Sequence, residues 1–114
     1  MAESHVLLGF LYIEKNEAQK AFAEFSEALR LNPNSHDART GLGAALILKG
    51  DIDNAIEVLT DALSTNPYSE MTYYELGRAY ELKGENSKSK EMYKRALQKI
   101  VRKKVIPSSV SRCR

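Results

Sequence analysis

The stretch that decides the fold spans residues 36–69 and reads HDARTGLGAALILKGDIDNAIEVLTDALSTNPYS. Its pattern recurs on both sides at a fixed distance of 34 residues. A fixed period of this length is typical of stacked supersecondary units, so it outranks any single motif as evidence about the fold. The residues that recur are a leucine, a glycine, a lysine and an alanine: Leu8, Leu42 and Leu76; Gly9, Gly43 and Gly77; Lys15, Lys49 and Lys83; Ala28, Ala62 and Ala96.

Each repeat unit is predicted to be two antiparallel helices. In residues 36–69 the apolar side chains keep helical spacing in two runs, and the sequence Lys49-Gly50-Asp51 separates the runs. Pro67 ends the second helix. Asn34 or Ser35 can cap the helix that opens near His36, and Ser69 the next first helix, near Glu70.

The recurring glycine lies inside the first helix of each unit, where glycine costs about 1 kcal/mol relative to alanine. Three glycines at one register, Gly9, Gly43 and Gly77, therefore need a packing reason. We expect the two helices of a unit to approach closely at these points. Larger side chains on both helices would fill the remaining space: Tyr12, Leu46 and Tyr80 on the first helices, and Phe25, Leu59 and Tyr93 on the second.

At these residues the sequence resembles the tetratricopeptide repeat (TPR) family, whose pattern is leucine-glycine, an aromatic, then alanine, aromatic, alanine and proline. The resemblance covers three repeats, at residues 2–35, 36–69 and 70–103. The third repeat departs from the family pattern at Ser89, where alanine is usual, and at Val101, where proline is usual. The resemblance implies an all-α fold, an α-solenoid of three helix-turn-helix repeats.

The last helix is predicted to extend beyond the third repeat. Apolar residues keep partial helical spacing to Ile106, and Pro107 then stops the helix, so residues 104–114 would be its basic end and a disordered tail. No fourth repeat is expected, because the face toward one has become polar. There Asn86, Ser89 and Lys90 replace Ile52, Ala55 and Ile56.

Charge divides the chain into two parts. The net charge is +2, but residues 1–85 carry 7 Lys or Arg against 14 Asp or Glu, and residues 86–114 carry 10 against 1. An asymmetry this large indicates two electrostatically distinct surfaces. No apolar run is long enough to span a membrane, and no basic cluster precedes the first apolar run as in a secretory signal, so the default localisation is cytoplasmic.

The first helix is apolar nearly all round, over residues 6–13. A helix of that kind is normally buried on more than one side. Its partner helix and the second repeat can cover only part of it. Either a preceding repeat or another chain is therefore expected to cover the rest, and the sequence leaves both possibilities open.

The chain offers little chemistry. His5, His36 and Cys113 are the strong soft-metal ligands, and none lies at metal spacing from another. The glycines are spaced for helix packing rather than for binding phosphate, and no serine has a partnered histidine. We expect no catalytic residues, no metal and no cofactor, and therefore no enzyme.

The resemblance implies a concave face lined by the first helix of each repeat, which binds a partner peptide or helix over an apolar floor with an acidic rim. The acids of that rim would be Glu3, Glu14, Asp37, Glu75 and Glu81. Phe10, Ile13, Ile47 and Tyr74 are interpreted as groove residues, because they lie off the face that packs on the partner helix. Leu7, Leu48 and Leu82 fit either the groove or the core between repeats. The partner-binding residues carried over are Val6, Phe10, Ile13, Thr40, Ala44, Ile47, Tyr74, Glu75 and Arg78.

Three functions follow as hypotheses. The first is a protein-interaction module for a partner with apolar anchors and basic flanks. The second is a scaffold that self-assembles, either head to tail or through paired first helices. The third is binding of nucleic acid or an anionic membrane by the basic C-terminal helix, which lacks the interleaved aromatics that stack on bases. Some members of the family clamp acidic C-termini with lysine, asparagine and arginine, and at the matching places this chain has no such donors.

Overall fold

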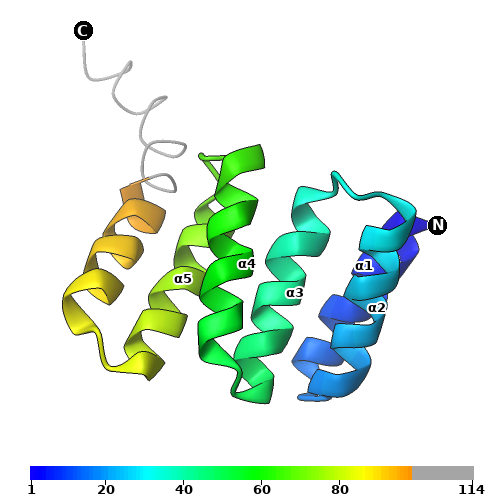
Figure 1. Ribbon diagram of the computed structural model, residues 1–114, viewed down its shortest axis with the longest axis horizontal. Helices are drawn as coiled ribbons and strands as arrows, with labels where there is room; N and C mark the ends of the chain where they lie inside the picture. Colours follow the sequence, from blue (N-terminus) through cyan, green and yellow to red (C-terminus); the bar gives the residue numbers. More distant parts are fainter. Residues whose placement is uncertain (99–114) are drawn as a thin grey trace, which may run out of the picture.

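The computed structural model describes residues 1–98, which fold into helices without a strand (Figure 1). This confirms the all-α class and the arrangement of helices in pairs. The helices are α1 (Ala2–Glu14), α2 (Ala18–Leu31), α3 (His36–Lys49), α4 (Ile52–Thr65), α5 (Glu70–Lys83) and a helical segment at 86–98.

The helix ends are those that the sequence indicates. The hydroxyl oxygens of Ser35 and Ser69 accept hydrogen bonds from the third backbone N–H that follows, at 3.2 and 3.3 Å, so both serines are N-caps. Gly50 and Gly84 end α3 and α5 with φ of +87° and +91°, a backbone conformation that favours glycine. Asn16 takes positive φ after α1.

The helices form two layers. The first helix of each pair contacts the first helix of the next, α1 against α3 and α3 against α5, whereas α2 and α4 do not contact each other. The first helices therefore lie closer together than the second helices. Helices that lie closer together occupy the inner side of a stack, so the first helices form the concave side and α2 and α4 the outer side; α4 lies in front of α5 in Figure 1.

The recurring glycine is the point of closest approach within each pair. A methyl group added to Gly9 would lie 2.6 Å from the ring of Phe25, and one added to Gly77 would lie 2.6 Å from the ring of Tyr93. At Gly43 the added carbon would overlap the side chain of Leu59. The predicted packing role of the three glycines is confirmed, and the side chain that occupies the space over each glycine is Phe25, Leu59 or Tyr93 of the second helix.

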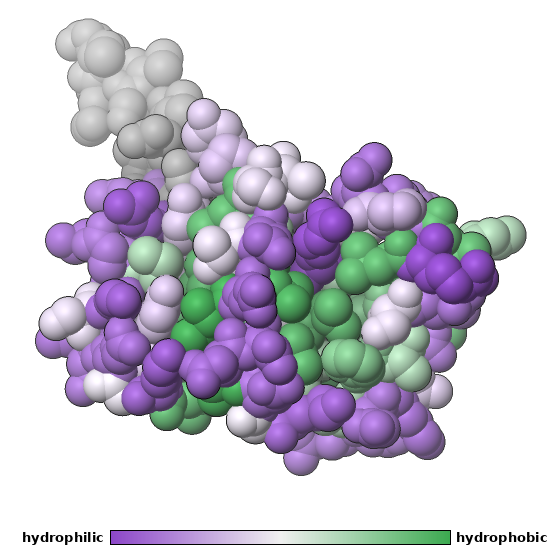
Figure 2. Space-filling model, in the orientation of Figure 1, coloured by the Kyte–Doolittle hydropathy of each residue, from purple (hydrophilic) through white to green (hydrophobic). Residues whose placement is uncertain are grey.

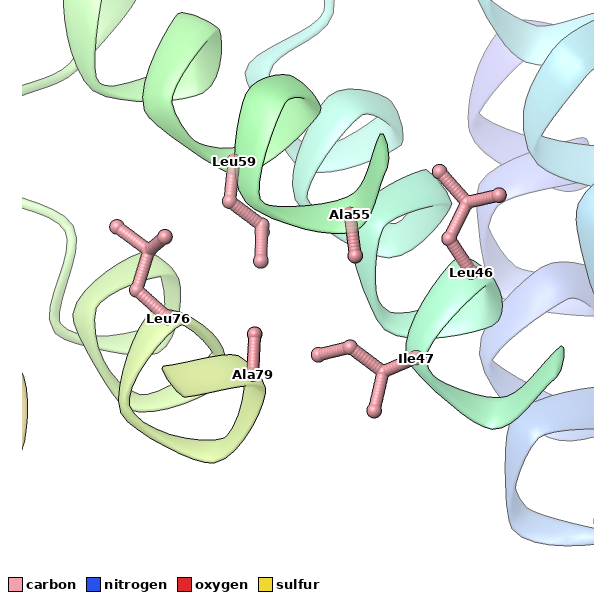
Figure 3. Packing of buried hydrophobic residues seen from close by; sticks show 6 residues of the cluster. All are labelled: Leu46, Ile47, Ala55, Leu59, Leu76 and Ala79. Atoms are coloured by element: carbon pink, nitrogen blue, oxygen red, sulfur yellow. The ribbon is translucent and has the colours of Figure 1, made fainter. Parts of the chain in front are cut away.

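The core is a series of contacts between neighbouring helices. Six buried side chains of α3, α4 and α5 meet in its larger cluster (Figure 3). A smaller cluster joins Ala21 and Phe25 of α2 to Ala45 of α3. No single centre holds the molecule together, so each pair of helices depends on its neighbours for stability. The larger cluster consists of Leu46, Ile47, Ala55, Leu59, Leu76 and Ala79.

Ser89 corrects one expectation about the third repeat. The sequence places Ser89 on a polar face turned away from the stack. In the structure it is buried, and its hydroxyl donates a hydrogen bond to the carbonyl oxygen of Gly77 at 2.9 Å. Because the hydroxyl finds a backbone acceptor on α5, serine takes the place that alanine has in the earlier repeats without leaving a buried polar group unpaired.

The expected extension of the last helix to Ile106 and the expected tail at 104–114 lie outside the described residues. Among residues 1–98, no helix is both long enough and apolar enough to cross a lipid bilayer.

The tight approach at Gly43 predicts a large loss of stability on substitution. Gly43→Leu should lower the free energy of unfolding by about 2 kcal/mol or more, because overpacking costs about 1–3 kcal/mol and the added side chain would overlap the fully buried Leu59. Urea unfolding followed by circular dichroism measures the change. Ala23→Leu on the exposed side of α2 is the control and should change stability by less than about 0.5 kcal/mol. An unchanged midpoint for Gly43→Leu would contradict the close-packing interpretation.

Candidate functional site: the concave face

The α1 residues assigned to the site lie at the edge of the core. Val6, Phe10 and Ile13 are half-buried and pack against the cluster around Phe25. The rings of Phe10 and Phe25 meet edge to face, with centroids 4.9 Å apart. These three side chains can therefore offer a partner only part of their surface.

The α3 residues assigned to the site are buried. Thr40, Ala44 and Ile47 are each less than 5% exposed. Ile47 points between α3 and α5, towards Ala79 (Figure 3). The interpretation of Ile47 as a groove residue is wrong, because the first helices contact one another directly and the middle one is covered from both sides.

Thr40 belongs to a polar network that the sequence did not reveal. Its hydroxyl lies 2.9 Å from that of Thr72 on α5, and both hydroxyls lie within 3.5 Å of His36 Nε2. His36 Nδ1 lies 3.1 Å from the carbonyl oxygen of Ala62 on α4. If Nδ1 donates to that carbonyl, Nε2 is left to accept from a threonine. The network ties α3, α4 and α5 together, so Thr40 acts as a core residue.

The α5 residues differ in exposure. Tyr74 is 50% exposed, Arg78 is half-buried, and Glu75 is buried. Leu82, which the sequence left between groove and core, is 61% exposed and so belongs to the surface. Met71 is exposed as well, which places Met71, Tyr74, Arg78 and Leu82 on one face at helical spacing.

Glu75 is therefore a buried acid and not part of the rim, which corrects the expectation from the sequence. Its carboxylate accepts a hydrogen bond from the Arg78 guanidinium at 3.0 Å. Burial raises the pKa of Glu75 above 4.5, because removal from water disfavours the charged form, and Arg78 opposes the rise. This ion pair leaves Arg78 partly neutralised at the surface.

Two tyrosines extend the α5 face onto the helical segment 86–98. The rings of Tyr74 and Tyr93 lie with centroids 5.8 Å apart, and the Tyr93 hydroxyl donates to Glu81 at 2.9 Å. Burial, followed by this bond to Glu81, raises the pKa of Tyr93 to about 12, so the phenol stays protonated at neutral pH. The face thus combines aromatic surface with an exposed carboxylate.

A hollow of about 340 Å³ lies at the opposite end of the stack, where α1 begins and the connection from α2 to α3 passes. The side chains of Glu3 and Asp37 are exposed acids on its lining, and Val6 and Leu7 supply apolar surface. Together with exposed Glu14 and Glu81, these acids form the acidic part of the first-helix surface. The full lining is Ala2, Glu3, Val6, Leu7, Asn32, Ser35 and Asp37.

The basic residues of segment 86–98 are partly engaged. Lys88 pairs with Glu85 at 3.3 Å and lies over the ring of Tyr80, and Arg95 pairs with Glu91 at 3.1 Å. Exposed Lys90 and Lys94 complete the described basic set. In residues 1–98, no three His, Cys, Asp or Glu side chains are grouped closely enough to hold a metal ion.

The outer surface alternates polar ridges with apolar seams. In the view with α2 and α4 in front, polar and charged side chains cover the outward sides of the helices, and apolar side chains show in the seams between them (Figure 2). An outer surface of this kind is typical of helices that bury one stripe against their neighbours.

Comparison with known proteins identifies the repeat family. Two models described as tetratricopeptide repeat match residues 12–59 and 72–98. A crystal structure of MamA is 32% identical, with a TM-score of 0.75, and the match covers 90% of this chain and 60% of that one. The chain therefore spans less than two thirds of that structure.

Two further solved structures share the fold. The type III secretion translocator chaperone SycD of Yersinia enterocolitica is 19% identical over 97% of this chain and 84% of that one, with a TM-score of 0.80. The TPR domain of Arabidopsis FLU is 23% identical over 87% of this chain and 93% of that one, with a TM-score of 0.75. The search of curated protein sequences found no match.

The burial of Ile47 predicts a core-sized loss when its side chain is shortened. Ile47→Ala should lower the free energy of unfolding by about 2–5 kcal/mol, because it leaves a cavity between α3 and α5. Leu82→Ala is the matched control and should cost less than about 1 kcal/mol, since that leucine is largely exposed. If urea unfolding gave the same loss of unfolding free energy for Ile47→Ala and Leu82→Ala, Ile47 would be a surface residue and not a core residue.

The raised pKa of Glu75 predicts a pH dependence of stability. The stability that protonated Glu75 contributes is present below pH 4.5 and is lost as pH rises through its higher folded pKa. Glutamine at position 75 cannot ionise, so the Glu75→Gln variant does not lose this stability. The difference in unfolding free energy, variant minus parent, should therefore rise from pH 4.5 to the folded pKa of Glu75 and then level off. Glu57→Gln on the exposed side of α4 controls for the loss of one negative charge. A relative stability that falls with rising pH would show that ionised Glu75 is favoured by folding.

Proposed function

The chain belongs to the tetratricopeptide repeat family, and we propose that it is a protein-interaction module whose concave face binds a partner segment with apolar anchors and basic flanks. Interaction through a helical repeat needs no catalytic group, and a partner in an extended or helical conformation can lie along the first helices.

The observation that carries the proposal is the exposed apolar face of α5. Met71, Tyr74 and Leu82 lie on one side of that helix with large exposed surfaces, although their neighbours Thr72, Leu76 and Ala79 are buried. Tyrosine is enriched among residues that dominate binding energy, because it buries a large rigid surface and keeps a polar end. The apolar anchors of a partner would pack here.

Charge supports a basic partner. Exposed Glu3 and Asp37 line the hollow at one end of the face, and exposed Glu81 lies beside the α5 residues at the other. Arg78 is the basic residue among those assigned to this face, and Glu75 already pairs with it. Lysine or arginine on either side of the apolar anchors would therefore meet carboxylates rather than like charge.

The similar structures support a protein partner in general terms. SycD is described as a translocator chaperone, and the match covers 84% of its chain. A protein with this fold therefore has another protein as its partner. At that level of identity the likeness concerns the fold, and the partner of the present chain is inferred from the chemistry of its own surface.

A binding selection tests this function. Peptides of about 12 residues selected from a random library on the immobilised chain should be enriched in one or two large apolar residues flanked by lysine or arginine. Tyr74→Ala should weaken the selected peptides about tenfold or more in fluorescence anisotropy, since loss of a central anchor commonly costs over 1 kcal/mol. Tyr68→Ala changes a tyrosine in the connection before α5 that is 69% exposed, against 50% for Tyr74, and is the control.

Two results would contradict the proposal. Selected peptides that are acidic would place the binding surface elsewhere, because the first-helix surface is acidic. Equal affinities for the parent and Tyr74→Ala, with Tyr68→Ala weakened, would move the site to the connection between α4 and α5.

A further inference from the structure

The first helix exposes a leucine face that the described part of the chain leaves open. Leu7 is 67% exposed and Leu11 is 54% exposed. Residues of a helix are about 100° apart around its axis, so these two leucines lie opposite Gly9, which is buried against Phe25. The inner side of α1 is packed on α2, and the outer side carries large apolar side chains into solvent.

The same positions in the later repeats are helix-packing positions. Gly41 is one period after Leu7 and packs against Phe25 of α2; Ala45 is one period after Leu11 and is fully buried. In the third repeat, Glu75 and Ala79 at these positions are also buried. In the later repeats another helix packs against this face. In α1 no helix of the described residues covers it.

A hollow on this face has the layout of a helix-packing hole. It measures about 270 Å³ and is lined by Leu7, Phe10, Leu11 and Glu14. Their spacing of i, i+3, i+4 and i+7 is that of the four residues that surround an inserted side chain when helices pack by knobs into holes. An apolar side chain projecting from another helix is the occupant that this layout fits.

Side-chain volume argues against a head-to-tail stack of copies. The small residues Gly41 and Ala45 leave room for Phe25. In α1 the corresponding leucines fill that room. The residue of segment 86–98 that corresponds to Phe25 is Tyr93, whose hydroxyl is already bonded to Glu81. A second copy that continued the stack would force a tyrosine against Leu7.

We propose that two copies of the chain pair through α1, with the two helices antiparallel and each residue facing the one that mirrors it about Gly9. Leu7 of one copy then faces Leu11 of the other and fills its hollow. Glu3 faces Lys15 of the other copy, twice in the dimer. Both charged side chains are exposed, and neither forms an ion pair within residues 1–98.

This interface is small, and the dimer is correspondingly weak. A contact confined to one helix of each copy buries less than the roughly 1,200 Å² at which stable interfaces begin. The dissociation constant is therefore expected at about 10–100 μM, which makes the association dependent on protein concentration.

Sedimentation equilibrium of the full chain up to about 0.5 mM, several times that dissociation constant, tests the pairing. The average mass of the parent should rise towards that of a dimer with concentration and not exceed it. Leu11→Glu should weaken dimerisation at least about tenfold without changing the helical signal, because the leucine is exposed in the monomer. Leu97→Glu is the matched control: that leucine is 59% exposed on segment 86–98, and the dimer should be unchanged.

A charge exchange tests the antiparallel register. Glu3→Lys or Lys15→Glu alone places like charges opposite each other twice and should weaken the dimer about fivefold. The double variant Glu3→Lys with Lys15→Glu restores both pairs and should recover the parent affinity. A parallel pair or a head-to-tail contact would show no recovery.

A parent that stays monomeric at the highest concentration overturns the pairing, as does a dimer that Leu97→Glu disrupts and Leu11→Glu does not. Higher oligomers would indicate a head-to-tail stack instead. Leu7 and Glu3 line both surfaces. Two other residues separate the proposals, since Tyr74→Ala should leave the dimer intact and Leu11→Glu should leave peptide binding at the α5 face intact.

Discussion

The closest approach of the two helices within each pair governs the rest of this structure. Gly9, Gly43 and Gly77 give each first helix a point without a side chain, and a large side chain of the second helix occupies the space. With that distance set, the first helices can contact one another along the stack while α2 and α4 stay apart. Because the first helices lie closer together than α2 and α4, they form the inner side of the stack.

The three first helices of the stack differ in how much of their surface is exposed. The middle first helix has a neighbour on each side, so packing buries Thr40, Ala44 and Ile47. The outer first helices have one such neighbour within the described residues, and they keep large apolar side chains exposed, such as Leu7 and Leu82. We therefore propose that a partner binds at the two ends of this short stack, while the buried middle helix connects them.

Polar groups make the contacts between repeats specific as well as tight. Thr40, Thr72 and His36 bond one another where α3, α4 and α5 meet, and Ser89 bonds the backbone of α5. Each hydroxyl has a partner, so burial does not carry the cost of an unpaired group. Shifting one helix along its neighbour would break these bonds, and we infer that they fix the register that apolar contacts alone would leave looser.

The sequence by itself determined the helix pairs, the cap at Ser69 and the packing role of the recurring glycine, because these depend on residues close along the chain or on a pattern repeated three times. For the helix that opens near His36 it left Asn34 and Ser35 as alternatives, and the structure shows Ser35 as the cap. It also indicated the apolar character of α1. Which side chains of the first helices reach solvent was decided only by the tertiary structure. Ile47 and Leu82 look alike as apolar residues of a helix, yet one lies between two first helices and the other at an open end. That difference depends on which neighbours cover each helix, and helical periodicity alone carries no information about neighbours.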